Sequence, residues 1–167
     1  MKLFFSFIVL LVIAFGCKDH NNHLKKVDKN WLDAVIKNSD SSYKKTYYRS
    51  DFVKAYYYIN RKDSSVCQVM KDSAESIRQI IMVKKNIRTY YAQYYPNGQL
   101  MAELPLDDFG QYHGKAIYYF SNEGIQSSGE YKHGLKTGPW RSYNESGKLV
   151  SIETFDENGK LISTALN

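Results

Sequence analysis

Cysteine is scarce in this sequence, since the 167 residues include only Cys17 and Cys67. Two cysteines form one bond at most, which excludes the disulfide framework that staples many small secreted domains. Cys67 lies in the run VCQVM, which is typical of a strand. We therefore predict that Cys67 is a small buried hydrophobic residue and not a reactive thiol.

Sequence signatures of catalysis are missing as well. The chain has no glycine-rich phosphate loop, no nucleophile elbow and no dinucleotide-binding fingerprint. Glu103, Asp107 and Asp108 are close together, and a carboxylate pair can serve glycoside chemistry, but adjacent aspartates before Phe-Gly are more often solvated turn residues. We therefore expect no catalytic residue, no metal site and no cofactor, so that the protein is not an enzyme.

A hydrophobic run long enough to span a membrane is absent from the N-terminus. The chain opens with MKLFFSFIVLLVIAFGC, whose apolar stretch is shorter than the about 20 residues of a membrane helix. It has one positive charge at Lys2, an apolar segment and small residues at Ala14 and Gly16, which is the pattern of a secretory signal. We predict that residues 1–16 are a signal peptide and are not part of the fold.

Two kinds of cleavage between Gly16 and Cys17 fit this segment. A cysteine directly after the small residue resembles the lipobox of bacterial lipoproteins, in which that cysteine is lipidated, although Ala14 stands where leucine is usual. On this interpretation Cys17 is the lipid attachment point, the protein is anchored in a bacterial cell envelope, and Cys67 is left without a disulfide partner. Ordinary cleavage after Gly16 would instead give a secreted or periplasmic protein, in which a Cys17–Cys67 disulfide could form.

The remaining chain divides into three parts by its patterns. Residues 17–28 are polar and aperiodic and are interpreted as a lipidated tether, in which Cys17, His20 and His23 have metal-ligand spacing without the expectation of a metal. Residues 29–87 are expected to form one short helix over KNWLDAVIK and then strands rich in Tyr, Ile and Val. Residues 88–167 are repetitive.

Positive charge exceeds negative charge, with a formal net charge of +6. The basic residues are spread along the chain, which favours a solvated basic surface and, next to it, attraction to an anionic membrane leaflet. Nucleic acid is not expected as a partner of a secreted protein.

The repeats combine aromatic residues with regularly spaced glycines. YYPNGQL, YYFSNEGI, SYNESGKL and TFDENGKL each place an aromatic residue before a glycine and an aliphatic residue after it. Aligning Gly110 and Gly114 on Gly134 and Gly138 gives an offset of 24 residues, in which His113 and His133 fall at different positions and are interpreted as turn residues. Asn-Gly between alternating apolar residues indicates a hairpin. Because such a tight turn needs a positive φ, which glycine tolerates, we predict turns marked on one edge of a sheet by Gly98, Gly124, Gly147 and Gly159 and on the other by Gly110 and Gly134. Gly114 and Gly138 are also predicted as turn residues.

These units, of the form G-x-x-x-G, an aromatic residue and Y-x-x-x-G-x-L, resemble the MORN-repeat variant of bacterial proteins that are often labelled YwqK-like antitoxins. The resemblance covers about residues 88–164 and is best over GLKTGPWRSYNESGKL. It implies an elongated single-layer sheet of hairpins that serves as an interaction surface or neutralises a toxin, and it carries no catalytic residues.

The fold expected is therefore mainly β, an elongated single-layer antiparallel β-meander of hairpin repeats with one short N-terminal helix. The function expected is binding of an unidentified protein partner, in the specific case a toxin, with a structural or anionic-lipid-associating role as the alternative. Aromatic rings either pack against neighbouring strands or form a binding platform. The candidate binding face consists of Tyr91, Tyr95, Tyr119, Trp140 and Tyr143.

Overall fold

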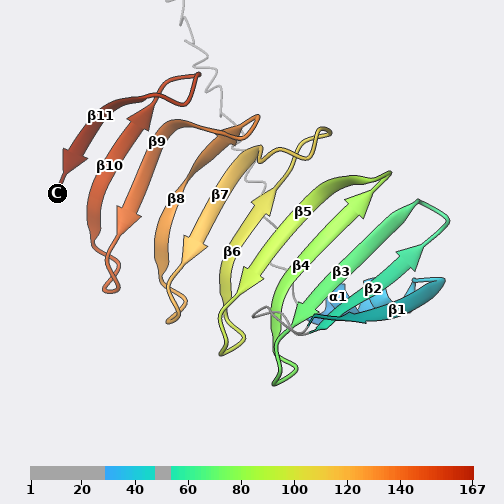
Figure 1. The fold of residues 1–167 in the computed structure, drawn as a ribbon. Coiled ribbons are helices and arrows are strands. Elements are labelled where there is room, and N and C mark those ends of the chain that lie inside the picture. Colours follow the sequence, from blue (N-terminus) through green and yellow to red (C-terminus); the bar gives the residue numbers. More distant parts are fainter. Residues whose placement is uncertain (1–28, 48–53) are drawn as a thin grey trace, which may run out of the picture.

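The protein forms one open β-sheet with a helix over part of one face (Figure 1). The computed structural model describes residues 29–47 and 54–167. The elements within them are α1 (Lys29–Lys37), β1 (Ser41–Thr46), β2 (Lys54–Asn60), β3 (Ser65–Lys71), β4 (Ile77–Lys84), β5 (Ile87–Tyr94), β6 (Leu100–Pro105), β7 (Gly114–Tyr119), β8 (Ile125–Lys132), β9 (Leu135–Tyr143), β10 (Leu149–Phe155) and β11 (Leu161–Leu166).

The strands lie across the sheet in sequence order, and every neighbouring pair is antiparallel. Aromatic and β-branched side chains favour these segments as strands, and polar residues with left-handed conformations close the turns between them. The expected mainly β fold, a single-layer meander of hairpins with one short helix in the described residues, is confirmed.

Cross-strand partners form a row that shares one face of the sheet, since partners point to the same side. From β1 to β11 the row is Lys44, Tyr56, Val69, Ile80, Ala92, Glu103, Ile117, Ser128, Arg141, Ile152 and Ala165. The side chains from Val69 to Glu103 are buried, whereas Arg141 and Ala165 are exposed. One face of the sheet is therefore covered in its first half and open in its second.

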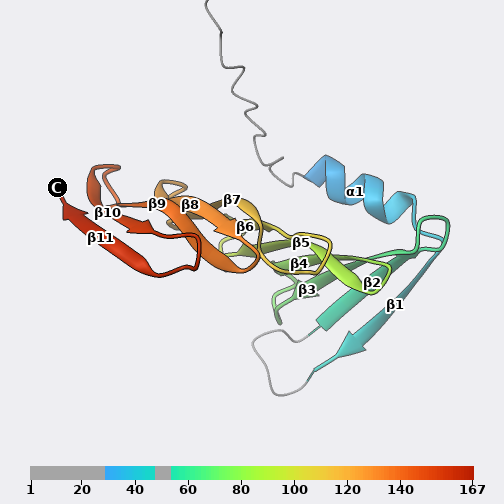
Figure 2. The same cartoon turned by 90° about the horizontal axis from the view of Figure 1, so that it is seen from above.

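The cover of the first half is α1, which lies over the first strands of the sheet (Figure 2). Its apolar residues Trp31, Leu32, Val35 and Ile36 recur at helical spacing and pack on this face, which we call the helix-side face. Buried under the cover are Leu32, Cys67, Val69, Ile80, Ala92 and Leu100. Cys67 is 1% exposed, which confirms the prediction of a buried residue.

The covered region also contains a buried carboxylate. Glu103 is 2% exposed and lies beside Ala92 in the row. Tyr90 donates its hydroxyl to Glu103 Oε1 over 2.6 Å, so that this buried oxygen has a hydrogen-bond donor. Burial, together with this carboxylate, raises the pKa of Tyr90 well above its ordinary value.

One type of turn recurs along the edge of the sheet that is lower in Figure 1. In each case a backbone N–H bonds to the carbonyl four residues later, and the fourth residue of the turn bonds back to the first. These turns are Asp72–Ser76, Tyr95–Gln99, Phe120–Gly124 and Asn144–Lys148. The first begins outside the region in which the sequence showed repeats, so the repeated hairpin extends further toward the N-terminus than expected.

The edge predicted for the turns of Gly98, Gly124 and Gly147 is confirmed, whereas the edge predicted for Gly159 is wrong. In the second repeat, however, Glu123 and not Gly124 takes the left-handed position, with φ of 68°. Gly159 lies in the turn between β10 and β11, on the edge that carries the turns of Gly110 and Gly134. The physical reason is that each hairpin reverses the chain, so successive turns alternate between edges.

Gly114 and Gly138 lie in strands and not in turns, which corrects their prediction as turn residues. Their φ angles are 93° and 62°. Gly138 lies beside the register shift between β8 and β9, where a left-handed residue fits a bulge in the strand.

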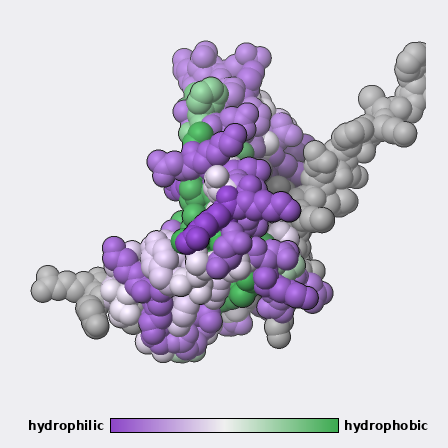
Figure 3. Space-filling model, turned by 90° about the vertical axis from the view of Figure 1, so that its right-hand side faces the viewer, coloured by the Kyte–Doolittle hydropathy of each residue, from purple (hydrophilic) through white to green (hydrophobic). Residues whose placement is uncertain are grey.

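The predicted signal peptide, tether and lipidation site at Cys17 lie outside the described residues. Among the residues that are described, no helix is long and apolar enough to cross a membrane. Seen from the β1 side of the sheet, the surface is mainly hydrophilic, and hydrophobic residues show only in a narrow band (Figure 3).

Candidate functional site

Aromatic residues cover the second half of the sheet on the face opposite α1. The group, which we call the aromatic cluster, consists of Tyr91, Tyr112, Tyr118, Tyr131, Trp140 and Phe155, packed around Leu104 and Ala116. Neighbouring rings touch, with centroids 5.4 Å apart for Tyr112 and Tyr131 and 5.0 Å apart for Tyr131 and Trp140. The cluster therefore acts as the hydrophobic core of the second half.

Trp140 is the centre of this cluster and is 4% exposed. Its indole lies against Gly129 of β8, where a Cβ atom would lie only 2.4 Å from the ring. The indole N–H donates to the carbonyl of Glu130 over 3.1 Å, and Lys136 Nζ lies 4.4 Å from the ring centroid, in cation–π range. Sequence reasoning missed Gly129, although a glycine inside a strand commonly marks such a close approach.

The five residues predicted as one binding face are divided between different surroundings. Tyr91 and Trp140 belong to the aromatic cluster, whereas Tyr119 packs with the core on the helix-side face. Tyr95 lies in a turn and donates its hydroxyl to the carbonyl of Tyr119 over 2.9 Å. Tyr143 ends β9 opposite Leu149 and is half-buried. The structure thus does not bring these five side chains to one surface.

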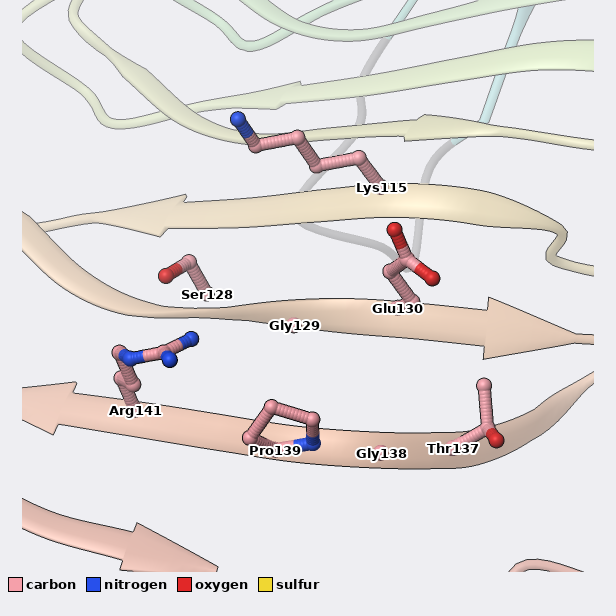
Figure 4. A pocket seen from close by; sticks show the side chains of 8 residues that line it. All are labelled: Lys115, Ser128, Gly129, Glu130, Thr137, Gly138, Pro139 and Arg141. Carbon is pink, nitrogen blue, oxygen red and sulfur yellow. The ribbon is translucent and has the colours of Figure 1, made fainter. Parts of the chain in front are cut away.

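A hollow lies instead on the helix-side face of the second half, beyond the reach of α1. Its volume is about 470 Å³, and it spans β7, β8 and β9 (Figure 4). We call it the open hollow; it is lined by Lys115, Ser128, Gly129, Glu130, Thr137, Gly138, Pro139 and Arg141. Sequence reasoning did not single out this group, because its members come from three strands and only Thr137, Gly138, Pro139 and Arg141 lie in one repeat unit.

The open hollow has charged side chains around it and a backbone base that packs on the aromatic cluster. Lys115 pairs across the strands with Glu130, which pairs with Thr137, and Ser128 pairs with Arg141. Figure 4 shows these side chains rising from the three neighbouring strands. The base is held from below, because Gly129 packs on Trp140 of the aromatic cluster. A recess with a packed backbone base and exposed charged side chains around it is suited to bind part of another molecule.

A second arrangement lies at the edge of the sheet that is upper in Figure 1. His113 and His133, interpreted from sequence as separate turn residues, lie side by side with ring centroids 4.9 Å apart. His133 Nδ1 is 2.8 Å from Asp107 Oδ2. The structure therefore brings together two histidines that fall at different repeat positions, with Asp107 beside them.

Comparison with known families agrees with the hairpin structure. No curated protein matches the chain. The MORN repeat variant matches at residues 89–108 and 136–157. MORN repeats in general are protein-binding or membrane-binding motifs. The first match spans the β5–β6 hairpin and the second the β9–β10 hairpin, so the chain carries MORN repeat variants at two places in one β-meander.

Proposed function

We propose that this protein is a non-catalytic, lipid-anchored protein of a bacterial cell envelope that binds a protein partner through the open hollow. The observation that carries the proposal is that part of one face of the sheet has nothing packed on it in the described residues. α1 covers the helix-side face of the first half, and the aromatic cluster covers the other face of the second half. The helix-side face over β7–β9 stays open and is recessed.

The chemistry of the hollow supports a protein ligand. Exposed Lys115, Glu130 and Arg141 offer both signs of charge, and Pro139 offers an apolar contact. Both signs of charge beside an apolar contact can discriminate between protein surfaces by charge complementarity. MORN repeats commonly bind proteins or membranes, which agrees with this use of the sheet.

The anchor and the identity of the partner are finer parts of the proposal. The support for lipidation is the cysteine that follows the apolar N-terminal segment. The support for an antitoxin or immunity role is the resemblance of the repeats, and in that case the partner is a toxin that reaches the envelope.

The test is a quantitative pull-down from membranes of the native host with the tagged full chain. Lys115→Glu combined with Arg141→Glu reverses two charges in the hollow. The matched control, Lys148→Glu combined with Lys160→Glu, makes the same change at exposed turn positions. We expect a stoichiometric partner that the parent and the control retain and the hollow variant loses at least tenfold. Equal recovery by all three chains would contradict binding through the hollow.

A structural role at an anionic lipid surface is the second candidate, favoured by the formal net charge of +6. It predicts that the chain without its lipid binds phosphatidylserine or phosphatidylglycerol vesicles and releases them as salt rises. Salt-sensitive vesicle binding, together with no recovered protein partner, would replace the first candidate by this one.

A further inference from the structure

Asp107, His113 and His133 place three potential metal-ligand atoms within 4.8 Å of one another. We call them the His–Asp cluster. Asp107 comes from the loop between β6 and β7, His113 directly precedes β7, and His133 lies in the turn between β8 and β9. His133 Nδ1 is 2.8 Å and His113 Nδ1 is 4.0 Å from the same oxygen, Asp107 Oδ2.

The backbone holds Asp107 so that this oxygen faces the histidines. Its other oxygen, Oδ1, accepts hydrogen bonds from the N–H groups of Phe109 and Gln111, both over 3.0 Å. These two bonds occupy Oδ1 and leave Oδ2 directed toward His113 and His133.

The two histidines are also held by their own backbone. The N–H of His113 donates to the carbonyl of Pro105 over 3.1 Å. The N–H of Gly134, the residue after His133, donates to the carbonyl of Tyr112 over 2.8 Å, which ties the two loops together. His133 has a φ of 49°, a left-handed conformation fixed by its two-residue turn. Only side-chain rotations are therefore needed to adjust the ligand atoms.

We propose that Asp107, His113 and His133 form a binding site for a divalent transition metal ion, with Zn²⁺ as its best occupant. Two imidazoles and one carboxylate suit zinc, cobalt, nickel or copper, whereas calcium and magnesium require mainly oxygen ligands. Ligand bonds of about 2.0–2.2 Å place ligand atoms about 3.3–3.6 Å apart in a tetrahedron. The distances from Asp107 Oδ2 to the two histidine Nδ1 atoms, 2.8 and 4.0 Å, lie on either side of that range.

A bound ion would join the β6–β7 loop to the β8–β9 turn at one edge of the sheet. Both histidines are exposed, so water can complete the coordination. The site is independent of the proposed partner binding, because it lies among the edge loops and shares no residue with the open hollow.

The test is calorimetric titration of the full chain in detergent with ZnCl₂, followed by the visible absorption of the Co²⁺ form. The parent carries Cys17→Ser, His20→Gln and His23→Gln and no polyhistidine tag, so that the N-terminal segment offers no competing ligands. We expect one equivalent to bind with micromolar affinity, tetrahedral Co²⁺ absorption and a rise in Tm with zinc.

His113→Gln and His133→Asn should each weaken binding at least tenfold, and asparagine keeps the left-handed position of residue 133 available. Asp108→Asn, next to the cluster, is the matched control and should bind as the parent does. Circular dichroism and Tm without metal check that each variant is folded. No saturable binding, or equal binding by both histidine variants and the parent, would overturn the site and leave His133–Asp107 as a simple hydrogen bond.

Discussion

The indole of Trp140 lies directly against Gly129 on the neighbouring strand, in the place that a side chain of residue 129 would occupy. This contact joins the hydrophobic core on one face of the second half to the open hollow on the other. Trp140 belongs to the aromatic cluster on one face, and Gly129 forms part of the base of the open hollow on the other. A change at Gly129 therefore affects both faces.

Gly129→Ala should lower the free energy of unfolding by at least about 2 kcal/mol, because a Cβ atom would lie 2.4 Å from the indole. Ser128→Ala, one residue away, should change it by no more than about 0.5 kcal/mol. Urea denaturation measures both. In a Trp140→Leu background the cost of Gly129→Ala should fall by half or more, and an undiminished cost would place the strain elsewhere.

Glu123→Gly should stabilise the protein by about 0.5 kcal/mol. Glu123 has a φ of 68°, where a side chain is strained and glycine is not. The hydrogen bond lost with it, from Gln99 Nε2 over 3.3 Å, is exposed and contributes little.

Gly147→Val makes the reverse change, because it replaces glycine by a larger residue at the equivalent position of the next repeat. A Cβ atom at residue 147 would meet nothing within 4 Å, so a clash of the Cβ atom does not add to the cost of the positive φ. We expect a loss of at least about 1 kcal/mol in thermal or urea unfolding. The assignment of the turns fails if Gly147→Val leaves stability unchanged.

Cys67 should make stability fall at high pH. Burial raises the pKa of its thiol from 9.0 to about 12. Below about pH 9 the thiol is neutral in both states and its contribution is complete; as pH rises toward 12 only the unfolded chain ionises, and that contribution is lost. Cys67→Ala should remove this part of the pH dependence, up to about 1.4 kcal/mol per pH unit.

The raised pKa values of tyrosines, such as Tyr57 and Tyr94 at about 12, also make stability fall at high pH. They do so equally in the parent protein and in Cys67→Ala. The comparison of the two chains therefore isolates Cys67. Chemical denaturation between pH 8 and 11 measures the dependence of stability on pH. Identical profiles for the parent and Cys67→Ala would show that the thiol is accessible in the folded state. Rapid reaction of the folded parent with Ellman's reagent would show the same.

Cys17→Ala should release the protein from membranes into the soluble fraction, because several acyl chains at about 0.8 kcal/mol per buried methylene keep a lipoprotein bound. Fractionation of host cells, with mass spectrometry of the N-terminal peptide, measures this. Lys18→Ala is the neighbouring control and should stay bound. Membrane retention of Cys17→Ala would argue against the lipid anchor.

The sequence predicted the meander well because its signals are local. Asn97-Gly98 and Ser146-Gly147 specify hairpin turns within a few residues, and the apolar face of KNWLDAVIK specifies the helix. The prediction failed at Glu123, because we expected glycine at the left-handed position of each turn and this turn has glutamate there. The hairpin hydrogen bonds, and not residue preference, determined that conformation.

Which side chains share a face was harder to predict. Bulges shift the register beside Tyr94 and Tyr119. Alternation along the sequence therefore no longer tells which face of the sheet a side chain lies on after each hairpin. Tyr95 precedes Tyr119 by 24 residues, but Tyr94 is its structural equivalent: Tyr94 pairs with Leu100 as Tyr119 pairs with Ile125. The His–Asp cluster and the open hollow depend on contacts between strands and leave no local signal.

The alternation of turns between the two edges has a consequence for how such a protein can change in evolution. A unit of about 24 residues contains two strands and returns the chain to the same edge with the same direction. Gain or loss of a whole unit would lengthen or shorten the sheet by about 9.6 Å, from two strand spacings, and preserve the role of each face. A change by one strand would instead move every later turn to the opposite edge. The length of such a sheet is therefore expected to vary among descendants in steps of two strands.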